Sequence, residues 1–380
     1  MKKLIFLLTV FCCVDAAAQP EFVKKIGRFI DSMSVRGVDR RYIDAPEKPW
    51  QVMVQGNINQ SDVHIKSQFD GSLLFEDVKG MFTWEPCVKT DVSSYVGFWA
   101  GYRGYGLGYS VNVGGDKGSL FKLGATGGSY GVNLRIHRFE TDEPTVHFEY
   151  DDISGAHESG DGHYYLIDPM YVKVVSLDGY YLFNGKRFSY CAAYDQSVFQ
   201  KRSAGSFMVG AMYYKSTIIY DNNPDADFIL MMNDIGKIKQ YQFAIGPGYA
   251  YNFVPCKGLL ISAMAMPMIT VSNKIDVWHY NSNLRKAALS GDDADIDIED
   301  YVIYPSEGAN KIYYPYEKEF KTSHRSDATV ILDARLSVTY NTGNWFFNTY
   351  ALLNRFRFEF DTTKGHLTDW SINACVGIRL

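Results

Sequence analysis

Residues 370–380 read WSINACVGIRL, and this stretch at the end of the chain indicates the fold most clearly. Its residues alternate between two faces: Trp370, Ile372, Ala374, Val376, Ile378 and Leu380 are apolar, whereas Ser371, Asn373, Cys375, Gly377 and Arg379 are mostly polar or very small. A period of two is typical of a β-strand with one apolar face. About 9 to 11 residues of this kind are enough to cross a membrane as a barrel strand.

The same alternation recurs along most of the chain. It begins at Trp50 and continues in residues 105–113, 130–137, 241–253 and 328–341. Aromatic residues collect towards the ends of these segments, as girdles do at membrane interfaces. The sequence therefore predicts an all-β fold, an antiparallel transmembrane (outer-membrane) β-barrel of about 12 strands, with a range of roughly 10 to 14, over residues 50–380.

Composition agrees with this class of protein. The chain has 380 residues, of which 46% are hydrophobic and 15% aromatic, and its formal net charge is -5. The many tyrosines suit positions that are apolar on one side and wet on the other. Because no basic footprint is present, we expect no nucleic-acid partner.

The N-terminal segment has the pattern of a secretory signal peptide. Residues 1–19 combine Lys2 and Lys3 with the apolar stretch 4–14 and the small residues 16–18. Residues 20–49 predict a short amphipathic helix over 21–37 and then a linker, both periplasmic. After cleavage four cysteines remain, and their pairing cannot be read from their spacing: Cys87, Cys191, Cys256 and Cys375.

The connections predict how the barrel is oriented. Short turns are expected at residues 184–186, 255–257 and 342–344, and long polar loops at about 141–162, 221–236 and 273–326. Barrels place short turns on the periplasmic side and long loops outside. We therefore expect an outer-membrane protein with extracellular long loops, whose partners are membrane lipid and the barrel-assembly machinery, recruited by the C-terminal strand. The alternation of short and long connections loses parity between Lys186 and Tyr220, so one strand there is misassigned.

Three stretches resemble a known family. They are residues 39–43, residues 102–110, and residues 188–193 followed by the motif 200–206. Together they are similar to an uncharacterised family of outer-membrane β-barrels from Bacteroides-type bacteria, classed as a domain of unknown function. The motif residues are Gln200, Lys201, Arg202, Ser203, Gly205 and Ser206. The resemblance implies the fold and the location but no activity.

Charged residues on the non-apolar face of the strands are the candidates for a lumen site. They are Arg135, His137, Asp333, Arg335, Arg355, Arg357, Glu359 and Arg379. In a barrel this face points inward, where opposite charges pair across or along the wall. Two interpretations stay open: a polar channel or ligand cavity, and a plugged, cross-braced interior.

Other chemistry has weaker support in the sequence. Ser203 or Ser206 could act as the nucleophile of a lipid hydrolase, but none of the eight histidines lies near them in sequence. The acidic run 292–300 lacks the glycine and glutamate of an EF-hand, and the spacing of His147, His157 and His163 matches no zinc pattern. We therefore predict no catalytic residue, no metal site and no cofactor.

The combined hypothesis is a non-enzymatic outer-membrane barrel. Its role would be that of a small-solute channel or binder, or of a structural component of the envelope. Two alternatives stay open: an outer-membrane lipid-modifying hydrolase, and a soluble secreted β-sandwich that binds carbohydrate.

Overall fold

The computed structural model describes most of the chain beyond the N-terminal segment. The described residues are 37–70, 81–115, 117–143, 145–151, 157–163, 165–166, 169–219, 235–282, 316–325, 328–360 and 363–380. The expected signal peptide, the amphipathic helix and the acidic run 292–300 lie outside these residues. Among the described residues, no helix is long and apolar enough to span a bilayer.

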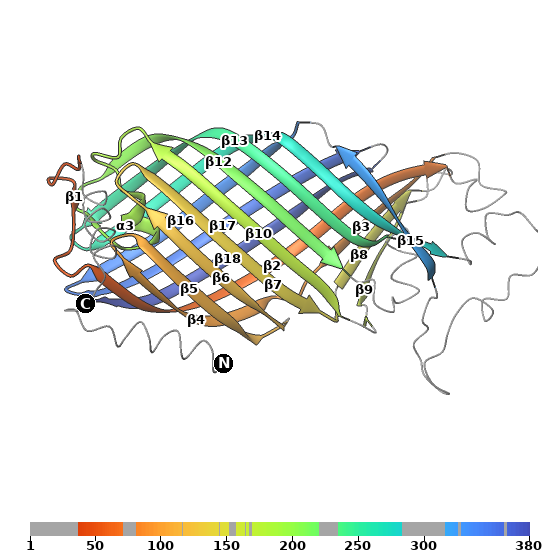
Figure 1. Cartoon of the computed structure of the whole chain (residues 1–380), viewed down its shortest axis with the longest axis horizontal. Coiled ribbons are helices and arrows are strands. Elements are labelled where there is room, and N and C mark those ends of the chain that lie inside the picture. The colour runs from red at the N-terminus through yellow and green to blue at the C-terminus, as the bar shows by residue number, and fades with distance from the viewer. Residues whose placement is uncertain are drawn as a thin grey trace, which may run out of the picture.

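Twelve antiparallel strands form a closed barrel (Figure 1). In chain order they are β2 (Trp50–Asp70), β4 (Ser93–Tyr102), β5 (Tyr105–Gly114), β6 (Lys117–Thr126), β7 (Tyr130–Thr141), β10 (Met170–Leu182), β12 (Ala204–Ile219), β13 (Ile235–Cys256), β14 (Leu259–Ser282), β16 (Val330–Thr342), β17 (Trp345–Phe360) and β18 (Thr363–Arg379). The barrel closes where β18 pairs with β2, and the backbones of Trp50 and Leu380 exchange two hydrogen bonds at this seam. The predicted fold class is confirmed.

Apolar side chains face outward from the barrel wall. On β12, Phe207 is 70% exposed while its neighbour Met208 is 2% exposed, and the same alternation continues along the strand. Because the sheet closes on itself, these outward residues have no second sheet to pack against. The alternative of a soluble two-sheet sandwich is therefore wrong.

The two ends of the barrel differ. We call the end that carries Trp50 and Leu380 the terminal end, and the opposite one the loop end. At the loop end further strands extend the wall: β3 (Met81–Lys89), β8 (Thr145–Asp151), β9 (His157–His163) and β15 (Tyr316–Arg325). Parts of the segments expected as long loops are therefore strands. In 141–162, β8 pairs with β3 and with β9, and in 273–326 the end of β14 pairs with β15.

The terminal end is closed by a segment that turns into the barrel. After β10 the chain enters the short helix α3 (Tyr190–Tyr194), then β11 (Phe199–Gln200), which pairs with β1 (Ile43–Asp44). In Figure 1 α3 lies inside the barrel wall, close to β1 and the C-terminus. This segment explains the lost parity between Lys186 and Tyr220, because a stretch expected to cross the membrane instead folds into the lumen.

Candidate functional site

A plug segment, residues 183–203, fills the terminal end of the lumen. Its centre is α3, in which Tyr190, Cys191, Ala192 and Ala193 are buried. Ser189 caps the N-terminus of the helix, and its hydroxyl accepts a hydrogen bond from the Ala192 amide at 3.2 Å. Five residues are too few for a stable isolated helix, so contacts with the wall must hold this turn in place.

Side chains of the wall bind the carbonyl groups that the plug leaves unpaired. The Ala193 carbonyl accepts from Ser337 Oγ at 2.6 Å and from Asn348 Nδ2 at 3.0 Å. The Asp195 carbonyl accepts from Gln51 Nε2 at 3.1 Å. Buried backbone carbonyls cost free energy unless they are bonded, so these donors on β2, β16 and β17 fix the position of the plug.

Arg379, the last residue of β18, binds the plug as well. Its guanidinium donates to the Gln196 carbonyl at 2.7 Å and lies 4.3 Å from the centre of the Phe199 ring. Arg379 is 1% exposed. The lumen side of the seam strand is therefore joined directly to the plug.

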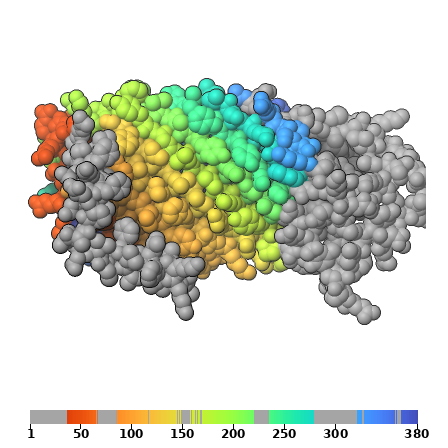
Figure 2. All heavy atoms as spheres, in the orientation of Figure 1, coloured from red at the N-terminus to blue at the C-terminus, as the bar shows by residue number. Residues whose placement is uncertain are grey.

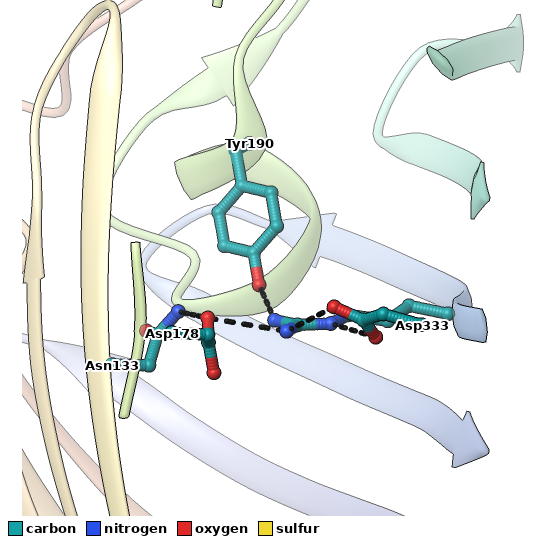
Figure 3. A network of polar contacts seen from close by, with 5 residues as sticks. Asn133, Asp178, Tyr190 and Asp333 are labelled. Carbon is teal, nitrogen blue, oxygen red and sulfur yellow. Dashed lines mark hydrogen bonds and ion pairs between the residues drawn. The ribbon is translucent and has the colours of Figure 1, made fainter. Parts of the chain in front are cut away.

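A buried ionic network joins α3 to two sides of the wall (Figure 3). The Arg335 guanidinium binds Asp333 through two hydrogen bonds, at 3.1 and 2.8 Å, and reaches Asp178 at 3.1 Å. It also donates to the Tyr190 hydroxyl, and Asn133 Nδ2 donates to Asp178 at 2.8 Å. A buried charge is tolerated only when its partners are in place, so the network sets the position of Tyr190 relative to β10 and β16.

The motif 200–206 organises the return of the plug to the wall. Gln200 Oε1 accepts from the Ser189 amide at 2.9 Å and from Asn252 Nδ2 at 3.1 Å, while Gln200 Nε2 donates to the carbonyls of Arg187 and Arg202. The buried side-chain amide of Gln200 therefore connects both ends of the plug segment with β13.

The remaining motif residues have similar structural contacts. Ser203 Oγ accepts from the Val254 amide at 2.9 Å, and Ser206 Oγ accepts from the Asn184 amide at 3.0 Å. Lys201 pairs with Asp44 at 3.3 Å. Both candidate nucleophiles are thus hydrogen-bonded to backbone, as a structural role requires.

All three family stretches meet at the terminal end. Arg103 in the β4–β5 turn donates to the Pro46 carbonyl at 2.8 Å, and the Lys201 amide donates to the Tyr42 carbonyl at 2.7 Å. Gly104 has a φ of +89°, and a Cβ there would lie 2.6 Å from the Thr126 carbonyl oxygen, so only glycine fits. The motifs seen in the sequence are therefore the parts that seat the plug.

The lumen beyond the plug is largely filled. Inward methionines of β12 and β14 are buried, namely Met208, Met212, Met264, Met266 and Met268. Lys122 and Arg135 line two small cavities here, of about 90 Å³ and about 30 Å³. Lys122 donates to Asn373 Oδ1 at 2.7 Å and to the Tyr350 hydroxyl at 3.0 Å.

The structure brings most of the predicted lumen residues together inside the barrel. Arg135 lines the cavities, and His137, Asp333, Arg335 and Arg379 are buried. By contrast, Arg355, Arg357 and Glu359 on β17 are exposed and lie on the outer face. On this strand the inward positions hold Leu352, Asn354 and Phe356, and the Phe356 ring stacks on Tyr214 inside the barrel.

Several residues of the site were not identified from the sequence. Four lumen-facing residues belong to this group: Lys122, Asp178, Gln51 and Asn348. Gln51 and Asn348 bind carbonyl groups of the plug, whereas Lys122 and Asp178 bind other side chains of the wall. A signal for Lys122 and Asp178 was available, because each is a charge at an inward position of an otherwise alternating strand. Nothing in the sequence indicated that residues 189–196 enter the barrel.

The cysteines and histidines also have positions in the structure. Cys87, Cys191, Cys256 and Cys375 are all free thiols. His147 on β8 contacts Asp161 on β9 at 2.7 Å, and Thr145 contacts His163 at 3.3 Å. Within the described part of the chain, no group of three potential ligands is placed to hold a metal ion.

Comparisons with known proteins agree with the resemblance seen in the sequence. The family model described as "Domain of unknown function (DUF4421)" matches residues 37–379. No curated protein matches the chain significantly.

Similar solved structures are barrels of the outer membrane. They include the outer membrane protease OmpT from Escherichia coli (6% identity, TM-score 0.38, covering 88% of this chain and 97% of that chain). The translocator domain of the autotransporter NalP from Neisseria meningitidis has 8% identity and a TM-score of 0.30, with 95% and 96% covered. The β domain of the Bordetella autotransporter BrkA has 11% identity and a TM-score of 0.27, with 85% and 99% covered.

Proposed function

The chain belongs to the family described as Domain of unknown function (DUF4421), and from that premise we propose that it is a closed barrel of the outer membrane with a non-enzymatic, structural or binding role. The observation that carries the proposal is the plug segment, whose carbonyls are bound by side chains of β2, β16, β17 and β18. A barrel closed in this way can anchor its exposed end in the membrane, but its lumen offers no open path for solutes.

The proposed orientation follows from the connections. Strand pairs at the terminal end are joined by short turns, such as Arg103–Gly104 and the turn between Cys256 and Leu259. The loop end carries the added strands β3, β8, β9 and β15. Since barrels place short turns in the periplasm, we assign the terminal end and the plug to the periplasmic side.

The filling of the lumen supports a closed state over a small-solute channel. The larger of the two cavities, about 90 Å³, is smaller than the cavity of about 150 Å³ that holds one benzene molecule in another protein. Arg335 with Asp333 and Asp178 crosses the remaining space. Solute passage would require the plug to leave, and with it the bonds that hold its carbonyls.

Conductance of the refolded protein in a planar lipid bilayer tests this proposal. We expect the wild-type chain to insert without forming steady open channels. A variant in which residues 189–196 are replaced by a Gly/Ser segment of equal length should conduct, because the bulky part of the plug is gone. Folding of both proteins is checked by their mobility shift on heating before electrophoresis.

Steady open currents from the wild-type protein would overturn the closed-barrel proposal and favour the channel. Failure of the folded chain to insert into any bilayer would overturn the membrane location itself. If the Gly/Ser variant folds and inserts but stays silent, the interior beyond the plug is closed independently, and the plug is not the element that closes the barrel.

A further inference from the structure

A short strap crosses the outside of the plug. We call residues 37–44, which end with β1, the strap. Its backbone reaches the start of the plug segment, because the Asp39 amide donates to the Lys186 carbonyl at 2.8 Å. It also reaches the end of that segment, where the Lys201 amide donates to the Tyr42 carbonyl at 2.7 Å and β1 pairs with β11. In Figure 1 β1 lies at the terminal end, farther from the centre of the barrel than α3.

Side chains fasten the strap to the same two places. The centre of the Tyr42 ring lies 5.2 Å from the guanidinium carbon of Arg187 and 5.9 Å from that of Arg202. Cations at this distance from the face of an aromatic ring are attracted to it. Lys201 pairs with Asp44 at 3.3 Å. The strap therefore holds both ends of the plug segment from the outside, whereas the wall holds the plug from within the lumen.

Ile43 is the apolar anchor of the strap, and it is 3% exposed. It packs in a buried cluster that joins the plug to β14, whose other members are Cys191, Ala192, Ala193, Val198 and Leu260. Removing an aliphatic side chain of this size from water is favourable. Without the strap this side of α3 would face water, and a helix of five residues is not stable without such packing.

The chain that follows the strap is bound to the barrel wall and not to the plug. Arg103, in the turn between β4 and β5, donates from its guanidinium to the Pro46 carbonyl at 2.8 Å. The Arg103 amide donates to the Pro49 carbonyl at 3.1 Å, and β2 begins at the next residue, Trp50. A displacement of the strap is therefore confined to residues 37–44, and it is transmitted from the N-terminal side.

The strap also has bonds of its own. The amides of Tyr42 and Ile43 both donate to the Asp39 carbonyl, at 2.9 and 3.0 Å. The Asp39 carboxylate accepts two hydrogen bonds from the Arg41 guanidinium, at 3.0 and 2.8 Å. Because these groups are paired within the strap, it can detach as a unit. The bonds that break are then those between strap and plug.

We infer that the strap is a latch on the plug. While β1 is paired with β11 the terminal end stays closed, and withdrawal of residues 37–44 releases α3 from its outer seat and lets this end open. Figure 2 shows the strap, coloured red, at the surface of the terminal end, where a pull on the chain before Gly37 acts on it first. The inference rests on the proposed closed barrel, because a latch matters only where the plug blocks the lumen.

The reactivity of Cys191 and the conductance of the barrel together test the latch. All proteins are refolded without residues 1–19 and carry C87S/C256S/C375S, so the buried Cys191 is the one thiol present. This reference protein should react slowly with a maleimide and stay silent in a planar bilayer. A variant that also lacks residues 20–44, and the variant Ile43→Asp, should both show brief openings. Their labelling should be at least about tenfold faster, because a carboxylate in an apolar seat, or loss of the seat's cover, favours local opening.

Two controls separate the latch from a general loosening of the protein. Removal of residues 20–36 alone leaves the strap in place, and Val92→Asp introduces a carboxylate at an exposed turn position of the loop end. Both should behave like the reference protein, and fast labelling of either would overturn the inference. Folding is checked by the mobility shift on heating. If the variant without residues 20–44 does not fold, Ile43→Ala replaces it, and labelling of I43A at the reference rate would overturn the latch.

The reference protein separates failure of the latch from failure of the closed barrel. If the reference is silent and the folded strap variants are silent too, with Cys191 still protected, the latch is wrong and the barrel remains closed. Fast labelling without openings would show that the strap only covers α3, and it would also overturn the latch. Steady currents from the reference protein itself would overturn the closed barrel, and the latch with it.

Discussion

At the scale of single residues, Arg335 joins three buried side chains of the interior. Its guanidinium is shared by Asp333, Asp178 and Tyr190. We predict that Arg335→Ala lowers the free energy of unfolding by about 3–5 kcal/mol, because two buried carboxylates lose their counter-charge. Urea unfolding of the refolded barrel measures this change.

Arg357→Ala is the matched control for this prediction, since Arg357 is exposed on the outer face of the neighbouring strand. It should shift the unfolding midpoint little. Replacing Asp178, Asp333 and Arg335 together by Asn, Asn and Met should recover part of the loss. Unfolding of R335A at the wild-type midpoint would show that the network does not stabilise the fold.

Ser206 tests whether the motif 200–206 has a structural or a catalytic role. Its hydroxyl accepts from the Asn184 amide, so Ser206→Ala leaves a backbone donor unpaired. We predict a loss of stability of about 1–3 kcal/mol. Incubation with phospholipid should release equal, background amounts of fatty acid from the wild type and from the S203A/S206A variant. Lipid release that requires either serine would restore the hydrolase alternative.

Sequence reasoning at this scale succeeded where polarity and position agree. Asp333 and Arg335 alternate with leucine and alanine, and both are inward and buried. It failed on β17, because Phe356 and Leu352 are inward while Arg355 and Arg357 are outward near the loop end. An apolar side chain marks the lipid-facing side of a strand only where that strand lies within the membrane. Beyond the membrane, charged side chains face water on the outside of the barrel and apolar side chains fill its interior.

At the scale of elements, Asp276 adds side-chain contacts to the backbone pairing that holds β15 against β14. This residue is 4% exposed and pairs with Lys274 of its own strand and Lys321 of β15, while Ser323 donates to it at 2.8 Å. We predict that Asp276→Asn increases the hydrogen-exchange rate of the β15 amides while leaving β16 and β17 protected. Both lysine partners are more than 40% exposed, so each lost pair contributes less than about 1 kcal/mol and the barrel itself should stay folded.

Asp44→Asn serves as the control for β15, because Asp44 forms an exposed pair with Lys201 at the other end of the molecule. It should leave exchange in β15 unchanged. Unaltered exchange in D276N would mean that backbone pairing alone attaches β15 to β14.

The elements differ in how well the sequence predicts them. The strands could be predicted because alternation is a local pattern that burial on one face imposes. The plug could not, because α3 has only five residues and its bonds come from Ser337, Asn348 and Gln51, more than 140 residues away in the chain. Contacts so distant in sequence leave no periodic trace in the segment itself.

At the scale of the whole molecule, closure of the barrel and seating of the plug share one residue. We predict that Arg379→Ala slows closure and lowers the temperature at which the folded band disappears on electrophoresis. The reason is that the Gln196 carbonyl loses its donor and the lumen beside the seam loses a buried side chain. Arg355→Ala, at an exposed position on β17, should behave like the wild type. Equal behaviour of the two variants would show that seam and plug form independently.

The position of Arg379 also bears on the order of events during biogenesis. The Gln196 carbonyl that it binds lies 183 positions earlier in the chain. Until β18 pairs with β2, the wall has two unpaired strand edges and the plug lacks the guanidinium of Arg379. Unpaired edges can add strands from other chains, so a slow closing step exposes the folding barrel to aggregation. The side chain that seats the plug therefore also belongs to the strand whose pairing removes this hazard.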